Sequence, residues 1–196
     1  MHACLVEGRD DRVAIFAHAQ GLIVVVADGA GGMGGGAQAA QSVIDAISRE
    51  AWNADASHWV RVLAKLDHEI DPGQTTAIVA CVGADFIVGA SVGDSHAWWF
   101  GPQKQRCLTS EQKRKPLLGS GEALPIGFNF ESRDPATLVV ASDGLWNHAP
   151  LERIASIASR PPVEAARALV DVVKYPNGSR PDDVCVAVVQ LTARAA

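Results

Sequence analysis

Residues 24–36 read VVVADGAGGMGGG, so a run of strand formers ends in one carboxylate and enters a loop made mostly of glycine. The apolar run Leu22 to Ala27 predicts a buried strand, and Asp28 is the first polar residue after it. Six of the eight residues that follow Asp28 are glycines. Because glycine has no side chain, a loop of this kind lets backbone approach other groups closely.

A glycine-rich loop after a strand suggests a phosphate-binding loop, but the surrounding residues do not fit one. The Walker A loop closes with Gly-Lys-Ser/Thr before a helix, whereas Gly36 is followed by Ala37-Gln38. The dinucleotide fingerprint can be placed on Gly29, Gly31 and Gly34, yet it lacks the parallel βαβ context that gives it meaning. The sequence therefore disfavours nucleotide binding.

Strand and helix patterns extend outward from this stretch. Residues 12–18 and 22–27 flank the turn Ala19-Gln20-Gly21, which predicts a hairpin. Further predicted strands are residues 75–82, 86–92, 97–100, 105–109, 136–142 and 184–191, and the predicted helices are 37–52, 57–70, 151–158 and 163–173.

These elements occur in blocks rather than in strict alternation. The four strands between residues 75 and 109 are joined by short turns, which predicts an antiparallel meander. Residues 110–132 show no clear period and predict an irregular loop. Blocks of strands and helices favour an α+β fold, with two antiparallel sheets and helices packed outside them, over a doubly wound parallel sheet. We expect a single domain over residues 1–196.

Composition excludes several classes of protein. A hydrophobic fraction of 48% and a charged fraction of 20% are ordinary for a globular chain with a substantial core. The net charge of -5 argues against a general nucleic-acid binder. The short basic clusters at residues 103–106 and 112–115 are interpreted as solvated loops.

Cysteine usage and the N-terminus indicate a cytoplasmic protein. The four cysteines have no metal-motif spacing, and a disulfide framework is not expected in a chain of this size without an export signal. The N-terminus lacks the layout of a signal peptide. The longest apolar run, residues 22–27, is too short to span a bilayer.

Aspartates recur where apolar strands begin or end. Such residues are usually turn formers, but strands of one sandwich can bring their ends to a common rim. Clustered carboxylates repel one another and persist where a cation neutralises them, and all-oxygen ligation selects Mg²⁺ or Mn²⁺. The aspartates in this context are Asp28, Asp94, Asp143, Asp182 and Asp183.

Five short motifs together span nearly the whole chain: DGAGG (28–32), GQTTA (73–77), VGDS (92–95), ASDGLW (141–146) and DDV (182–184). In this order they resemble the motifs of the metal-dependent serine/threonine protein phosphatases of the type 2C class, in a compact bacterial form. The resemblance implies a four-layer αββα sandwich with a metal centre at one end of the sheets.

The resemblance implies a metal-binding role for each matching position. Asp28 would bridge two Mn²⁺ or Mg²⁺ ions, joined by the carbonyl of Gly29. Asp143 and Asp183 would hold the first ion. Asp94 would hold, with Asp143, a third and weaker ion.

The N-terminal turn would complete the catalytic site. Asp10 would serve the second ion, largely through water. Arg9 would clamp the phosphate, because a guanidinium matches phosphate oxygens in a bidentate way. Arg12 is the alternative for that role.

The activity implied is hydrolysis of phosphoserine and phosphothreonine by a metal-bridging hydroxide, without a phosphoenzyme. Asp10 departs from the family pattern, because the usual residue there is a glutamate, which is one methylene longer. Three further positions also depart from the pattern. Ala30 stands where many members have a histidine proposed as general acid. His96 replaces an arginine and is a candidate substitute acid, and Asn147 replaces an aspartate.

The expected partners are a phosphoprotein substrate and an opposing serine/threonine kinase, with no nucleic acid and no membrane, and we expect a monomer. A reduced flap over about residues 107–132 would leave the site open. Two alternatives remain: a catalytically silent regulator that keeps the fold and binds a partner, and a small-molecule phosphatase.

Overall fold

Two antiparallel sheets of five strands each form the centre of the computed structural model, which describes residues 1–192. The first sheet has the order β1-β10-β9-β6-β7, so the two ends of the described chain pair with each other inside it. Its strands are β1 (His2–Glu7), β10 (Val184–Leu191), β9 (Ala136–Ala141), β6 (His96–Phe100) and β7 (Gln105–Cys107).

The second sheet has the order β2-β3-β4-β5-β8. Its first two strands form the predicted hairpin, in which Arg12 pairs with Ala27 and His18 with Gly21. Its strands are β2 (Arg12–His18), β3 (Gly21–Ala27), β4 (Ala77–Val82), β5 (Phe86–Val92) and β8 (Ile126–Glu131).

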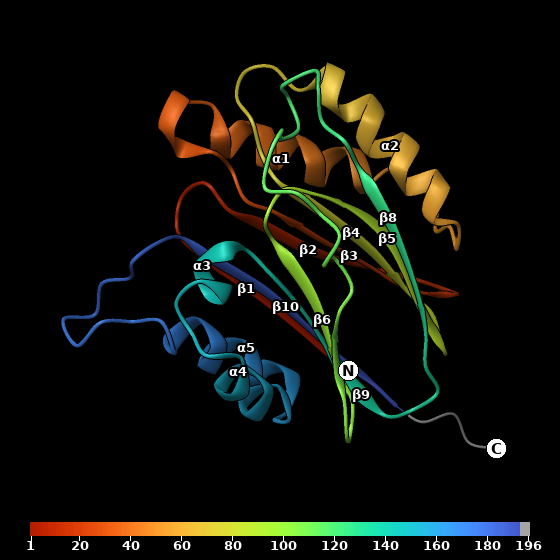
Figure 1. Ribbon diagram of the computed structural model, residues 1–196, viewed down its shortest axis with the longest axis vertical. Coiled ribbons are helices and arrows are strands. Elements are labelled where there is room, and N and C mark those ends of the chain that lie inside the picture. Colours follow the sequence, from red (N-terminus) through yellow and green to blue (C-terminus); the bar gives the residue numbers. More distant parts are fainter. Residues whose placement is uncertain (193–196) are drawn as a thin grey trace.

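Helices cover the outer faces of both sheets, which confirms the predicted αββα sandwich. In Figure 1, α1 and α2 lie over the second sheet, and α4 and α5 lie against the first. The helices are α1 (Gly36–Ile47), α2 (Ala56–Glu69), α3 (Asp143–Trp146), α4 (Leu151–Ala158) and α5 (Pro162–Asp171), with a short 3-10 helix, η1 (Gly31–Met33), in the glycine loop.

Strand β3 shows why the apolar runs are continuous. Val24 and Val26 pack between the two sheets, whereas Val25 packs beneath α1 and α2, and all three are fully buried. Successive side chains on a strand point to opposite faces. A strand that lies between another sheet and a helix layer therefore needs apolar residues at every position.

Two sequence predictions about the middle of the chain were wrong. The meander is broken after β5, because β6 pairs with β9 and β7 in the other sheet. Residues 93–95 therefore connect the two sheets. Residues 110–132 are not irregular throughout, because β8 pairs along β5 as an edge strand. Only Phe128 of β8 is buried, so its sequence carries little hydrophobic pattern.

Smaller differences lie at element ends. The first helix ends at Ile47 rather than at residue 52, and β7 ends at Cys107 rather than at residue 109. The strand β1 and the short helix α3 were not predicted. Strand β1 alternates between exposed and half-buried residues at the sheet edge, and α3 is only four residues long, so neither has a strong sequence signal.

A buried carboxylate of α2 anchors the loop between β7 and β8. Asp67 is 4% exposed, and its Oδ1 accepts hydrogen bonds from the backbone amides of Gly119, Ser120 and Gly121 at 2.8–3.1 Å. Its Oδ2 accepts from the amide of Ala123 at 2.9 Å. One side chain thus orders the second half of a loop that has no secondary structure of its own.

Replacing Asp67 tests this anchor. We expect Asp67→Ala to lower the free energy of unfolding by about 3 kcal/mol, because four amides lose a charged acceptor, and Asp67→Asn to cost less, because one acceptor oxygen remains. Urea unfolding measures both values. Glu69→Gln, on the exposed end of the same helix, is the matched control and should leave stability unchanged. Equal stability of Asp67→Ala and the control would contradict the anchor.

Candidate metal and phosphate site

The strand ends gather at one rim of the sandwich around a cavity of about 620 Å³. Four aspartates line it, together with part of the glycine loop, the 72–74 turn and the loop after β7. The lining residues are Asp28, Gly29, Ala30, Gly31, Gly32, Gly34, Pro72, Gly73, Gln74, Thr76, Asp94, Arg114, Lys115, Leu117, Gly119, Asp143 and Asp182.

The motif residues Thr75 and Thr76 fix the backbone of Asp28. The amide of Asp28 donates to Thr76 Oγ1 at 3.0 Å, and its carbonyl accepts from the Thr76 amide at 2.8 Å and from Thr75 Oγ1 at 2.9 Å. Thr76 Oγ1 also lies 2.8 Å from Ser95 Oγ, in the connection between the sheets. These contacts tie Asp28 to the turn that carries Asp94.

The glycines of the loop are needed for backbone packing rather than for gripping an anion. Gly73 has a φ of +98°, and a Cβ there would lie 2.3 Å from the carbonyl oxygen of Gly35. A Cβ on Gly29 would lie 2.4 Å from the carbonyl oxygen of Gly36. The loop therefore folds back on itself and against the 72–74 turn, which places Asp28 and Gly29 at the cavity wall.

Asp143 begins α3, directly after β9. Its Oδ2 accepts from Asn147 Nδ2 at 3.0 Å. Ser142 fastens this segment to β10, because its hydroxyl accepts from the amide of Cys185 at 3.0 Å. The amide at position 147, where the family pattern has an acid, therefore orients Asp143 and adds no further negative charge.

The crowding of carboxylates is visible in their pKa values. Burial, followed by the charges of Asp11, Asp143, Asp94 and Asp182, raises the pKa of Asp28 to about 9. Burial is also the main cause that raises the pKa of Asp143. A metal-free site therefore holds protons that carboxylates normally release.

Asp11 is a site residue that the sequence reading passed over. It is 1% exposed, its Oδ2 has no hydrogen-bond partner within residues 1–192, and burial raises the pKa of its carboxyl to about 6. It contributes to the raised pKa of Asp28. Its place as the second member of the acidic pair Asp10-Asp11 was the available signal.

The two adjacent aspartates before β10 take different positions. Asp182 lines the cavity, whereas Asp183 does not. Asp183 Oδ2 accepts from the backbone amides of Arg9 at 2.5 Å and Asp10 at 2.8 Å. Asp183 therefore ties β10 to the N-terminal turn, and Asp182 faces the other acids.

The N-terminal turn lies beside the cavity rather than in its wall. A Cβ added to Gly31 would lie 2.9 Å from Asp10 Oδ2, so this carboxylate lies close to the glycine loop. Arg9 is exposed and does not line the cavity. Arg12 donates to the carbonyls of Arg9 and Asp11 and to Gln41 Oε1.

His96 also lies outside the cavity wall. Its Nδ1 is 3.2 Å from Thr109 Oγ1, and its ring meets that of Trp146 edge-on. Burial lowers the pKa of His96, although the charges of Asp94 and Asp143 act in the opposite direction. These contacts give the imidazole a packing role.

The loop after β7 supplies a contact that the sequence did not suggest. Arg114 Nε lies 2.8 Å from Asp94 Oδ2, and both Arg114 and Lys115 line the cavity. The interpretation of residues 112–115 as a purely solvated cluster was therefore wrong. A basic run of this length has no pattern that separates a surface loop from a loop that folds over a site.

The donor set suits a hard divalent cation. The four lining aspartates provide oxygen only, and Asp11 adds a buried oxygen with no hydrogen-bond partner among the described residues. Within residues 1–192, no three histidine, cysteine or acidic side chains converge closely enough to cage an ion directly. Mg²⁺ commonly keeps several waters and is bound through one or two carboxylates, so it does not require such a cage.

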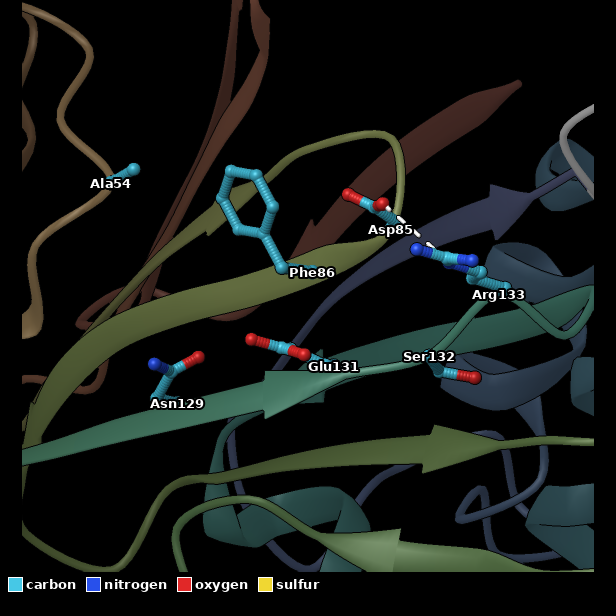
Figure 2. A pocket seen from close by; sticks show the side chains of 7 residues that line it. All are labelled: Ala54, Asp85, Phe86, Asn129, Glu131, Ser132 and Arg133. Carbon is cyan, nitrogen blue, oxygen red and sulfur yellow. Dashed lines mark ion pairs between the residues drawn. The ribbon is translucent and has the colours of Figure 1, made fainter.

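A second cavity, of about 500 Å³, lies at the other end of β5 and contains none of the predicted site residues. Figure 2 shows the side chains of Asp85 and Arg133 pointing toward each other. Arg133 Nε lies 3.9 Å from Asp85 Oδ2. No group of acids lines it comparable to the one around Asp28, among the residues that the structure describes. The acidic cavity is therefore the candidate site.

Comparison with solved structures identifies the fold. A bacterial serine phosphatase superimposes with a TM-score of 0.85 at 16% identity, over 100% of this chain and 99% of the other. The S. agalactiae serine/threonine phosphatase superimposes with a TM-score of 0.80 at 20% identity, over 96% of this chain and 98% of the other. The chain has the fold of the bacterial serine/threonine phosphatases.

This phosphatase fold confirms the resemblance that the motifs suggested, at the level of architecture. The catalytic domain of the phosphatase PstP, solved in complex with two manganese ions, matches with a TM-score of 0.77 at 20% identity, over 96% of each chain. No family model matches the sequence, and no curated protein matches it at a significant level. No helix within residues 1–192 is long and apolar enough to cross a membrane.

The raised pKa of Asp28 predicts how the metal-free phosphatase fold responds to pH. The folded chain holds a proton up to a pKa of about 9, whereas the unfolded chain releases it above 3.8. Stability is therefore fully present below the unfolded pKa and falls as the pH rises toward 9. We expect the urea midpoint in EDTA to decrease between about pH 5 and pH 8.

Asp28→Asn should flatten this decrease, because the substituted side chain does not titrate. Asp45→Asn, an exposed carboxylate of α1, is the control and should keep the wild-type profile. A wild-type midpoint that is constant across this range would show that the carboxylate cluster does not hold the extra proton.

Proposed function

We propose that the chain is a metal-dependent phosphatase that hydrolyses phosphoserine and phosphothreonine in proteins. The observation that carries this proposal is the burial of Asp28 among Asp11, Asp94, Asp143 and Asp182 on a phosphatase fold. A concentration of negative charge at a cavity wall is costly unless a cation balances it. The bacterial phosphatases of this fold supply the reaction class.

Five groups are proposed to hold divalent cations. Asp28 and the carbonyl of Gly29 lie at the end of β3, and Asp143 faces them from the start of α3. Asp94 lies on the connection between the sheets. Asp182 takes the role that the motif assigned to Asp183, because it lines the cavity while Asp183 is engaged by two backbone amides.

Asp10 is proposed to contact the second ion through water rather than as a direct ligand. Its carboxylate lies close to Gly31, and Asp10 is not among the residues that line the cavity. A role through water agrees with this position. Mn²⁺ or Mg²⁺ in two sites, with a third near Asp94, is the expected occupancy.

Bound cations of this kind supply a Lewis acid and a water with a lowered pKa, and they offset charge on a phosphoryl group. The chain's own residues position these components. Asn147 orients the Asp143 carboxylate, and Thr76 fixes both Asp28 and Ser95. Rigid placement of charged groups lowers the reorganisation needed during the reaction.

The chain offers no side-chain acid for the leaving group at the expected places. Ala30 has no titratable group, and the His96 imidazole contacts Thr109 outside the cavity. We propose that water protonates the seryl or threonyl oxygen. The partners would be a phosphoprotein and the kinase that opposes this reaction, with the chain acting as a monomer in the cytoplasm.

A silent regulator on this fold is the second candidate. It is favoured by the engagement of Asp183 in structural hydrogen bonds and by the absence of a histidine at Ala30. Calorimetric titration with Mn²⁺ separates the two functions, because only the enzyme needs the ion. A panel of small phosphate esters separates a small-molecule phosphatase from a protein phosphatase.

The central test is hydrolysis of a phosphothreonine peptide in the presence of Mn²⁺ or Mg²⁺. We expect turnover that EDTA abolishes and that Asp143→Asn reduces by about 100- to 1000-fold, because one of the groups that stabilise charge in the site is lost. Peptide hydrolysis that continues in EDTA, or at the wild-type rate in Asp143→Asn, would falsify the proposal.

The adjacent aspartates provide a matched pair of variants. Asp182→Asn should weaken Mn²⁺ binding and reduce turnover, since it removes a carboxylate from the cavity wall. Asp183→Asn should retain both, because an amide oxygen remains for the backbone amides of Arg9 and Asp10. Calorimetry with Mn²⁺ measures the first effect. If Mn²⁺ affinity and turnover fall in Asp183→Asn and not in Asp182→Asn, Asp183 is the metal ligand instead.

A further inference from the structure

The acidic cavity has one cationic side. Arg114 and Lys115 are the only basic side chains among the described residues that line it, and they face a wall that carries four aspartates. Both come from the loop between β7 and β8. A substrate phosphate that enters this cavity therefore meets positive side chains on that loop only.

The contact between Arg114 and Asp94 leaves hydrogen-bonding capacity on the guanidinium. Nε of Arg114 lies 2.8 Å from Asp94 Oδ2, while the Arg114 side chain is 77% exposed and that of Asp94 is 26% exposed. A guanidinium has five N–H donors, and a carboxylate engages at most two of them in a bidentate pair. Arg114 can thus contact a second anion without leaving Asp94.

The loop that carries these cations is held in place. Leu118 and Thr75 exchange backbone hydrogen bonds at 3.0 and 3.1 Å, and Asp67 fixes residues 119–123 from α2. Arg114 lies four residues before Leu118. Its approach to the cavity is therefore set by an anchored segment that also contacts the threonine pair supporting Asp28.

The arginines of the N-terminal turn do not compete for this position. Arg9 is exposed and does not line the cavity. Arg12 Nε donates a hydrogen bond to Gln41 Oε1, and its Nη1 donates to the carbonyls of Arg9 and Asp11. Neither arginine of this turn lines the cavity.

We propose that Arg114 binds the phosphoryl group of the substrate, bridging it to Asp94, and that Lys115 contributes a second and weaker contact. This inference rests on the proposed function, because it names the phosphate-binding residue of the same site. It replaces Arg9 in that role. The bridge would hold the phosphoryl group beside the proposed cation sites while Arg114 keeps its contact with Asp94.

Phosphate binding to the Mn²⁺-loaded full chain tests the proposal directly. Calorimetric titration with inorganic phosphate should show affinity reduced by about 10- to 100-fold in Arg114→Ala, the usual effect of losing a hydrogen bond between charged groups. Arg114→Lys should fall between the two, because an ammonium keeps the charge and loses the planar fork. The kcat/KM for a phosphothreonine peptide should fall by a similar factor in Arg114→Ala.

Lys113→Ala is the matched control, since Lys113 is an exposed cation next to Arg114 that does not line the cavity. It should leave phosphate affinity unchanged. Arg9→Ala tests the rival arginine. Arg114 is exposed, so its removal should not affect folding, and a thermal unfolding curve checks this.

The outcomes separate this inference from the proposed function. Phosphate affinity and peptide turnover that are the same in Arg114→Ala and Lys113→Ala, or reduced in Arg9→Ala instead, would overturn the assignment of Arg114. A wild-type protein that neither binds phosphate nor turns over the peptide would overturn it as well. Phosphate binding that depends on Arg114 without any peptide hydrolysis would support Arg114 and reject the proposed phosphatase.

Discussion

Asp28 is a carboxylate held in a position that electrostatics alone would not allow. Its backbone is fixed by three hydrogen bonds to Thr75 and Thr76, so the side chain remains at the cavity wall even though burial and neighbouring acids raise its pKa to about 9. The burial of strand β3 stabilises the folded state and so offsets the cost of placing this carboxylate there, because its valines pack against both flanking layers. The rigid core supplies the stability that the charged rim lacks.

The rim itself is joined across the two sheets by polar contacts. Thr76 and Ser95 connect β4 of the second sheet to the turn that leads into the first sheet. Asp183 connects β10 to the N-terminal turn, and Ser142 connects β9 to β10. Each of these groups lies beside an aspartate of the cavity. Apart from the Asp183 carboxylate, the groups that position the acids are hydroxyls and backbone amides, which add no further charge to the site.

The loop after β7 completes the cavity from outside this framework. Its hydrogen bonds to Asp67 and Thr75 allow a segment without regular structure to carry Arg114 to Asp94. The Asp67 carboxylate accepts hydrogen bonds from four backbone amides and so orders a segment that lies outside any strand or helix. Among the described residues, this loop supplies the basic side chains that line an otherwise acidic cavity.

The amino-acid sequence by itself determined the fold class and most of the acidic wall. Continuous apolar runs mark strands that are buried on both faces, and the aspartates at their ends could be read directly, because a strand end is a local feature. Asp28, Asp94 and Asp143 all line the cavity, as their positions suggested. Only the tertiary structure decided which of Asp182 and Asp183 faces it, because neighbouring residues at a strand entrance point in different directions. It also decided that β5 and β6 belong to different sheets, and that Arg114 rather than Arg9 reaches the site. These outcomes depend on contacts between segments far apart in the chain, such as Asp67 with residues 119–123 and Asp183 with residues 9–10, and no local pattern encodes them.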